Sequence, residues 1–228
     1  MLESLFAEFE RIVVFDTETT GISFERDEII EIGAVSLTTA GEQEQAELLI
    51  RLSPGRTLPP FITELTGITP EQLAAQGVEK AQACGAFCRL LEGGGPTLLA
   101  AYNAQFDLNF LYHFLRSFGR EGMLRPPRFL DALTVYRDRR DYPHKLENAI
   151  EAYGLGKTAV NSHRAVDDAR AAAQLLEAMA AERDDLIRYV DLFGTHPKYG
   201  LSGRRIASVT YRPQPYERAL PLYDLAEM

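Results

Sequence analysis

The chain has 228 residues, of which 46% are hydrophobic and 25% are charged. This is the balance of an ordinary globular protein, and it excludes disordered and fibrous chains. The formal net charge of −9 at pH 7 excludes a protein that coats nucleic acid with a broad basic surface. It does not exclude an enzyme with a carboxylate cluster, because bound divalent cations neutralise such a cluster.

The sequence carries no signal for export or membrane insertion. No apolar run approaches the roughly 18 residues that a membrane span needs. Glu3, Glu8 and Glu10 lie where a signal peptide needs positive charge. We therefore expect a cytoplasmic protein with no membrane partner. Cys84 and Cys88 lie four residues apart in a predicted helix, which favours reduced core thiols over a disulfide or metal site.

The N-terminal part predicts three strands in close succession, at Arg11–Phe15, Ile29–Leu37 and Ala46–Leu52. Because no helical pattern separates them, they favour an antiparallel meander. Further along, the pattern predicts helices and strands that alternate: helix Pro70–Ala75, helix Val78–Leu91, strand Thr97–Tyr102, helix Ala104–Phe118 and strand Arg128–Leu130.

Three more helices are predicted, over Ala132–Arg139, His144–Tyr153 and Arg164–Ala181. A meander followed by β-α-β units predicts an α/β fold, a mixed five-stranded sheet with helices on both faces. We assign residues 1–182 to this domain. Residues 183–228 are predicted to hold a helix over Asp184–Phe193 and a Gly/Pro/Arg-rich tail that cannot form its own core. The tail must therefore dock on the domain or remain extended.

Carboxylates follow two of the predicted strands. Asp16 and Glu18 lie two residues apart at the end of the first strand, so their side chains point to the same face. Asp107 follows the fourth strand, at the edge where ligands gather in open α/β sheets. Adjacent strands lie about 5 Å apart, so Asp107 can approach the first pair. Such a set suits hard cations such as Mg²⁺.

A third group lies at the start of the last predicted helix, in His163-Arg-Ala-Val-Asp167-Asp168-Ala169. Ser162 is a candidate cap for this helix, which would place the imidazole at its mouth and a carboxylate one turn further along. Two metal ions about 4 Å apart can activate a water and stabilise a leaving oxygen, with a histidine as the general base. The combination points to metal-assisted phosphodiester hydrolysis.

These segments resemble a known family. Phe15-Asp-Thr-Glu-Thr-Thr-Gly21, Asn103-Ala-Gln-Phe-Asp107 and His163–Ala169 are similar to the three exonuclease motifs of the DEDD superfamily, DnaQ-like branch. Leu65-Thr-Gly-Ile-Thr69 is similar to another segment of that family. The resemblance runs from about residue 11 to residue 181. Each motif alone is weak, but their order and separation together are specific.

The resemblance implies a ribonuclease-H-like fold and removal of nucleotides from 3′ ends with two Mg²⁺ or Mn²⁺ ions. It implies that Asp16, Glu18, Asp107 and Asp168 hold the metals and that His163 is the base. The family motif places its last acid five residues after the histidine, which selects Asp168 over Asp167. The tyrosine branch has a tyrosine where this chain has Arg164, so the histidine branch is favoured.

The resemblance also implies a substrate pocket. Leu65 and Thr66 are expected to meet the terminal base and sugar, and the same pocket is expected to be lined by Thr19, Asn103 and Phe106. Each could equally be a turn or core residue. Two positions depart from the family pattern: Tyr102 replaces a frequent histidine, and Asp131-Ala-Leu replaces Asp-Thr-Leu. Asp131 is most simply a helix cap.

The leading hypothesis is a 3′-to-5′ exonuclease for proofreading or repair, with DNA favoured over RNA. An exoribonuclease that trims RNA or short oligonucleotides is a second reading, and a catalytically idle nucleic-acid-binding subunit is a third. A polymerase or a sliding clamp is a candidate partner. Ala219-Leu-Pro-Leu-Tyr223 is similar to clamp-binding peptides, although the alternative is a segment packed on its own domain. The basic residues of the tail suit either phosphate steering or docking on the acidic body: Lys198, Arg204, Arg205, Arg212 and Arg218.

Overall fold

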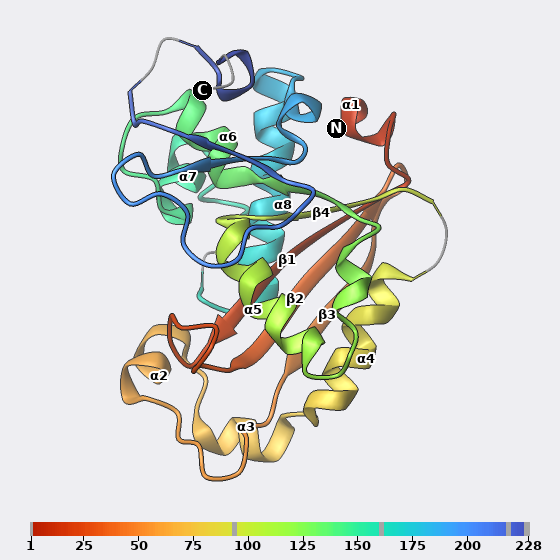
Figure 1. Ribbon diagram of the computed structural model, residues 1–228, viewed down its shortest axis with the longest axis vertical. Coiled ribbons are helices and arrows are strands. Elements are labelled where there is room, and N and C mark those ends of the chain that lie inside the picture. The colour runs from red at the N-terminus through yellow and green to blue at the C-terminus, as the bar shows by residue number, and fades with distance from the viewer. Residues whose placement is uncertain (1, 93–94, 160–161, 218–219, 226–228) are drawn as a thin grey trace.

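A computed structural model describes residues 2–92, 95–159, 162–217 and 220–225. Its main sheet (Figure 1) is made of β1 (Arg11–Thr19), β2 (Ile29–Thr38), β3 (Gly41–Leu49), β4 (Thr97–Ala101) and β5 (Arg128–Asp131). The strand order is β3-β2-β1-β4-β5. β2 is antiparallel to both β1 and β3, whereas β4 is parallel to both β1 and β5. The predicted mixed five-stranded sheet and its N-terminal meander are confirmed.

Helices cover both faces of this sheet (Figure 1), as predicted. The helices are α1 (Glu3–Phe6), α2 (Pro60–Thr66), α3 (Pro70–Gln76), α4 (Lys80–Leu91), α5 (Ala104–Arg116), α6 (Ala132–Arg139), α7 (Leu146–Ala152) and α8 (Ala165–Glu182). Among the described residues, no helix combines the length and hydropathy that a membrane crossing requires.

The alternation of side chains along β1 divides the core into two layers. Ile12 and Val14 pack against α1, α6, α7 and α8, whereas Val13 and Phe15 pack against α4 and α5. All four side chains are fully buried. Cys84 and Cys88 are buried in the second layer and form no disulfide, which confirms their assignment as core thiols. β1 therefore lies at the centre of the domain, and its C-terminal end carries Asp16 and Glu18.

Two elements before residue 70 differ from the prediction. β3 begins at Gly41 and ends at Leu49, rather than spanning residues 46–52. It is an edge strand whose first residues are exposed and polar, so it lacks the apolar alternation that reveals a strand. α2 was not predicted, because it is short and begins directly at Pro60. Its apolar residue Ile62 packs with Ile30 of β2 in a small separate cluster.

The predicted helix over Asp184–Phe193 is wrong. Only a 3-10 turn forms, at Leu186–Tyr189, and the chain then enters a strand, β6 (Leu192–Thr195). Asp191 breaks the helix because its φ of 56° is left-handed and its side chain accepts a hydrogen bond from the Phe129 backbone N–H at 2.8 Å. β6 pairs in parallel with β7 (Thr210–Pro213) in a separate two-stranded sheet.

The described residues of the tail after β7 dock on the domain rather than extending into solvent. Gln214 is 1% exposed, and its amide donates hydrogen bonds to the Thr134 carbonyl at 2.9 Å and to Asp138 at 2.5 Å. Arg212 donates to the carbonyls of Leu222 and Leu225, at 3.0 and 2.7 Å. These bonds join two parts of the tail to each other, so the roles expected for the basic residues, phosphate steering or docking on the acidic body, stay predictions. Arg218 and Ala219 lie outside the described residues.

Leu222 shows how firmly the tail is held. Its side chain is fully buried in the layer that contains α6 and α8, and its backbone N–H donates to Asp138 at 2.5 Å. Leu222 belongs to the segment that is similar to clamp-binding peptides. In the structure, this leucine packs on its own domain. Leu220, two residues earlier, is 55% exposed.

We expect Leu222→Ala to lower the free energy of unfolding by about 2–5 kcal/mol, because truncation of a buried leucine leaves a cavity. Leu220→Ala is the matched control and should change it by less than about 0.5 kcal/mol. Urea denaturation of the full chain measures both. Equal stabilities of the two variants would contradict a docked tail.

Candidate active site

The first two predicted carboxylates lie where β1 ends, next to β2. Asp16 pairs with Gly33 and Glu18 with Glu31 across the antiparallel register. Both side chains are partly exposed, while Thr17 between them is buried. The pairing shifts between Glu18 and Thr19, so the strand ends in an irregularity directly after the acids.

Asp107 connects the first turn of α5 to β1. It is 3% exposed, and its Oδ1 accepts hydrogen bonds from the Thr17 backbone N–H at 3.0 Å and from the Thr17 hydroxyl at 2.6 Å. α5 begins after Asn103, which adopts a left-handed φ of 65°. The chain therefore turns sharply out of β4, and the next turn of helix brings Asp107 to the strand that carries Asp16 and Glu18.

The third segment lies at the start of α8. Asp168 is 6% exposed and accepts a hydrogen bond from the Ser162 backbone N–H at 3.2 Å, while the Ser162 hydroxyl donates to Asp167 at 2.7 Å. The residue at the cap position is Arg164, so the expectation that Ser162 caps the helix is wrong. His163 is exposed and left-handed, with a φ of 53°.

The structure brings the third segment to the first. Ligand atoms of Glu18, His163 and Asp168 all lie within 4.8 Å of one another, which is close enough for one metal ion to contact all three. The two carboxylates offer the oxygen ligands that Mg²⁺ and Mn²⁺ prefer. The imidazole lies at the exposed side of this group.

The electrostatics show that the four acids form one cluster. Burial raises the pKa of Asp16 well above its usual value, and the negative charges of Asp107, Glu18 and Asp168 raise it further. Burial and the charge of Asp168 raise the pKa of Glu18 to about 9. Burial raises the pKa of Asp107 to about 7, although the Thr17 hydrogen bonds oppose this. A bound cation would favour the ionised forms that burial and mutual repulsion disfavour.

Glu31 and Arg164 hold the histidine segment against the sheet. The Glu31 side chain is fully buried on β2 and accepts hydrogen bonds from the Arg164 side chain at 2.6, 3.0 and 3.2 Å, and one from the Ala165 backbone N–H at 2.8 Å. Arg164 also bonds Glu47 on β3 at 2.9 Å. Sequence reasoning missed this pair, although a single acid within the apolar run Ile29–Leu37 was a signal, because a buried charge needs a partner.

Asp131 is a helix cap, as predicted. Its carboxylate accepts hydrogen bonds from the backbone N–H groups of Leu133 and Thr134 in α6. It also accepts one from the Ala104 N–H at the start of α5, at 3.0 Å. It thus joins the first turns of two helices, one of which carries Asp107. Tyr102, the other departure from the family pattern, donates its hydroxyl to the His144 carbonyl at 2.7 Å.

The five predicted substrate residues have diverse surroundings. Thr19 is buried and its hydroxyl donates to the Gly21 carbonyl, whereas Phe106 is half-buried with its ring 5.0 Å from that of Phe110. Asn103 lies at the start of α5. On α2, Leu65 is 49% exposed, but Thr66 is 3% exposed and its hydroxyl bonds the backbone within the helix and at its end. A role for these residues in substrate binding stays a prediction.

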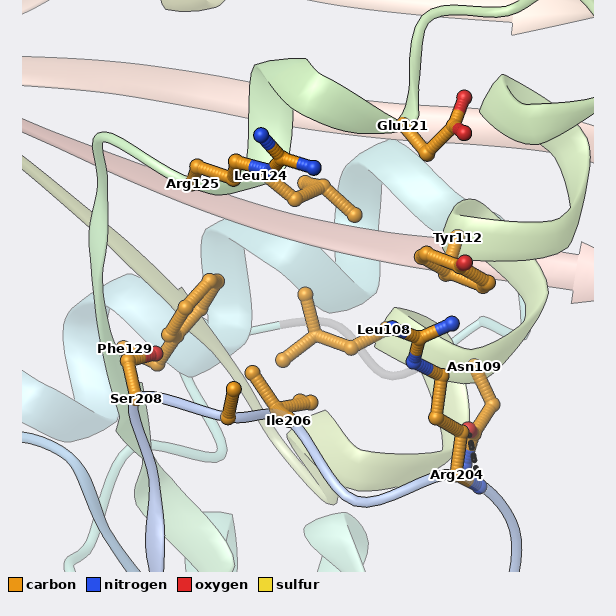
Figure 2. A pocket seen from close by; sticks show the side chains of 11 residues that line it. Leu108, Asn109, Tyr112, Glu121, Leu124, Arg125, Phe129, Arg204, Ile206 and Ser208 are labelled. Carbon is orange, nitrogen blue, oxygen red and sulfur yellow. Dashed lines mark hydrogen bonds between the residues drawn. The ribbon is translucent and has the colours of Figure 1, made fainter.

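A pocket of about 280 Å³ lies away from these groups, between α5, the 3-10 turn Glu121–Leu124 and the tail (Figure 2). Leu108, Phe129 and Ile206 form its apolar part, and Arg125 and Arg204 reach its edge. None of the ten predicted site residues lines it. The acids at the end of β1, rather than this pocket, therefore define the candidate active site.

The raised pKa of Asp168 gives a prediction for the metal-free protein. Burial raises this pKa from 3.8 to about 7, so the folded chain holds a proton that the unfolded chain loses. Stability from this group is complete below about pH 4 and is lost as the pH rises toward about 7. We therefore expect Asp168→Asn, which cannot ionise, to gain stability relative to the unsubstituted protein across this window, in urea denaturation with EDTA. Added Mn²⁺ should remove the gain. A pH-independent difference would contradict the raised pKa.

Comparisons with known proteins agree with this geometry. A family model described as Exonuclease matches residues 13–176. The DNA polymerase III subunit epsilon of Treponema pallidum is 34% identical over 184 residues, which cover 78% of this chain and 80% of that protein. A PolC-type DNA polymerase III of Clostridium perfringens is also 34% identical, but over only 11% of its own length.

The fold also has solved relatives. A complex of E. coli ExoI with single-stranded DNA superposes with a TM-score of 0.69 at 21% identity, and covers 80% of this chain and 43% of the other. This confirms the ribonuclease-H-like fold. The family model confirms the resemblance drawn from the three motifs, because the matched range contains all of them. The chain belongs to the Exonuclease family.

Proposed function

We propose that this chain removes nucleotides from the 3′ end of DNA by two-metal hydrolysis of the phosphodiester bond. The observation that carries the proposal is the convergence of carboxylates from β1, α5 and α8: Asp107 bonds Thr17 between Asp16 and Glu18, and Asp168 approaches Glu18. Burial raises the pKa values of all four, and the charges of Asp107 and Asp168 raise those of Asp16 and Glu18 further. Such a cluster is unfavourable by itself and becomes favourable when divalent cations bind it. Membership of the Exonuclease family supports the same chemistry.

The donor set fits the expected metals. Asp16, Glu18, Asp107 and Asp168 would hold two Mg²⁺ or Mn²⁺ ions, because hard cations prefer carboxylate oxygens. When bound, these ions supply an activated water and stabilise the leaving 3′ oxygen. The hydrogen bonds from Thr17 orient the Asp107 carboxylate, and the Ser162 backbone N–H orients that of Asp168.

His163 is proposed to accept the proton of the attacking water. Its imidazole is exposed and lies within 4.8 Å of oxygens of Glu18 and Asp168, so it can reach a water at the edge of the carboxylate cluster. Arg164, the next residue, is fixed by Glu31. This pair holds the histidine segment in place, and the imidazole stays exposed.

The substrate pocket is proposed to use two apolar surfaces. Leu65 is exposed and Phe106 is half-buried, so both can contact the terminal base. Thr66 would act through its position rather than its hydroxyl, which is already engaged with the backbone. Thr19 and Asn103 complete the pocket in this proposal, as the resemblance implies.

DNA is favoured over RNA because one relative is named as DNA polymerase III subunit epsilon and another as a PolC-type DNA polymerase III, and because E. coli ExoI is seen with single-stranded DNA. The same relatives favour a polymerase as partner. A sliding clamp has less support, since Leu222 of the clamp-like segment is buried. One experiment tests this function: Mg²⁺-dependent digestion of 3′-labelled single-stranded DNA, duplex DNA and RNA of matched sequence. Digestion of DNA supports the DNA exonuclease, digestion of RNA alone supports the exoribonuclease, and no digestion supports the inactive subunit.

Catalysis should require metal and the acids. We expect Asp16→Ala or Asp168→Ala to lower turnover at least about a hundredfold, because each change removes a carboxylate from the metal cluster. Asp167→Ala is the matched control, since Asp167 directly precedes Asp168 but bonds the Ser162 hydroxyl. Digestion of labelled oligonucleotides measures all three. Full turnover in excess EDTA, or a larger loss in Asp167→Ala than in Asp168→Ala, would contradict the assignment.

His163→Ala should lower turnover about 10²- to 10⁴-fold, as expected for removal of a general base. It should leave the affinity for Mn²⁺ nearly unchanged, because four carboxylates remain to hold the metals. Isothermal titration calorimetry with Mn²⁺ tests the second part. A large loss of Mn²⁺ affinity would make the histidine a metal ligand instead of a base.

A further inference from the structure

The loop that follows β6 lies beside the start of α5. His196, Gly200 and Leu201 of this loop line a pocket of about 130 Å³ together with Asn103 and Asp131. Asn103 starts the helix that carries Asp107, so this part of the tail begins next to the candidate active site. Sequence position does not reveal this proximity, because more than 90 residues separate the two segments.

Side-chain hydrogen bonds fasten the tail to α5. The Gln105 amide donates to the Arg204 carbonyl at 2.7 Å, and the Arg204 backbone N–H donates to the Asn109 side chain at 2.9 Å. Gly203 fits closely, because a Cβ at this position would lie 2.3 Å from the Asn109 amide nitrogen. The surface of the tail is therefore held in a fixed position relative to the active site.

A row of aromatic side chains leads away from this pocket. The ring of His196 stacks on Tyr199 with centroids 4.5 Å apart and lies 5.7 Å from the ring of Tyr216. Tyr216 in turn lies 5.6 Å from Tyr142. The tyrosines are exposed to an unusual degree, with Tyr199 at 74%, Tyr142 at 69% and Tyr216 at 40%. We call His196, Tyr199, Tyr216 and Tyr142 the aromatic track.

Cationic groups lie along the aromatic track. Lys198 Nζ is 5.2 Å from the centre of the Tyr199 ring, and the Arg137 guanidinium is 6.0 Å from that of Tyr216. Arg137 also lines the pocket that contains Asn103. Its Nε is buried and has no hydrogen-bond acceptor in the part of the chain that the structure describes. Acids also lie next to the track: Asp138 and Asp141 line a pocket together with Arg137 and Tyr216, and Glu217 adjoins Tyr216 in sequence.

We propose that the aromatic track binds single-stranded DNA upstream of the 3′ nucleotide that lies in the active site. Exposed aromatic rings stack on successive bases whatever their sequence, and cations beside them meet the phosphates. The track is continuous with the pocket at Asn103, and its cations stand out in a protein of net charge −9. The inference rests on the proposed function, because the 5′-to-3′ direction of the bound DNA is assigned from the position of the proposed active site.

The test compares two lengths of DNA in binding, so that catalysis is not needed. Fluorescence anisotropy, with Ca²⁺ in place of Mg²⁺, measures the affinity of 5′-labelled oligothymidylates of twenty and three nucleotides. We expect Tyr199→Ala and Tyr216→Ala each to weaken binding of the long strand about fivefold or more, because a stacking contact is lost. Binding of the short strand should stay within about twofold, because it reaches only the active site.

Two controls accompany these variants. Tyr199→Phe keeps the stacking surface and should retain affinity for the long strand. Phe118→Ala removes another exposed aromatic, 38% exposed near the end of α5 and outside the track, and should have no effect. Unchanged affinity of both track variants for the long strand would overturn the proposal. So would an equal loss on both lengths, or tighter binding of an RNA of the same length.

Failure of the proposed function gives a different result. The protein could hydrolyse neither oligonucleotide in Mg²⁺ while Tyr199→Ala still weakens binding of the long strand. That result would support DNA binding by the aromatic track and contradict the proposed activity. A protein that hydrolyses both lengths with no effect of Tyr199→Ala or Tyr216→Ala has the activity without the track.

Discussion

The close approach of the α8 N-terminus to β2 is the constraint on which the site depends. At Gly33 the two backbones come so near that a Cβ would lie 2.0 Å from the carbonyl carbon of Ala165. Only glycine leaves this space, and the bonds from Arg164 and the Ala165 N–H to buried Glu31 hold the helix there. Gly33 pairs with Asp16, so the contact that positions α8 also sets its distance from the first carboxylate.

The sequence alone predicts the placement of a side chain where that placement depends on a single helix or strand. Asp16 and Glu18 share a face because strand side chains alternate, and Asp131 caps α6 through local hydrogen bonds. The predicted start of edge strand β3 lies five residues after the observed one, because the exposed first residues of the strand show no apolar pattern. The acid at position 31 within an apolar run indicates that it needs a partner, but the identity of Arg164 as that partner depends on how a helix 133 residues later packs against the sheet.

The tail was the hardest part to predict, for a physical reason. Its segments are short and irregular, and no periodic pattern of apolar residues marks them. Side-chain contacts with helices earlier in the chain fix their positions. Gln214 is buried against α6, and Gln105 and Asn109 of α5 bind the backbone of residues 202–204. Polar residues on α5 and in the tail therefore act as structural contacts, although their sequence suggests solvent exposure.

The distribution of the acids along the chain has a consequence for biosynthesis. Residues 16 and 18 are made first, residue 107 follows, and residue 168 is made only after nearly three quarters of the chain. A nascent polypeptide that stops short of α8 has no helix to close the cluster against β2. In the assignment that we propose, an incomplete chain therefore lacks Asp168 and cannot hold the divalent cations through all four carboxylates.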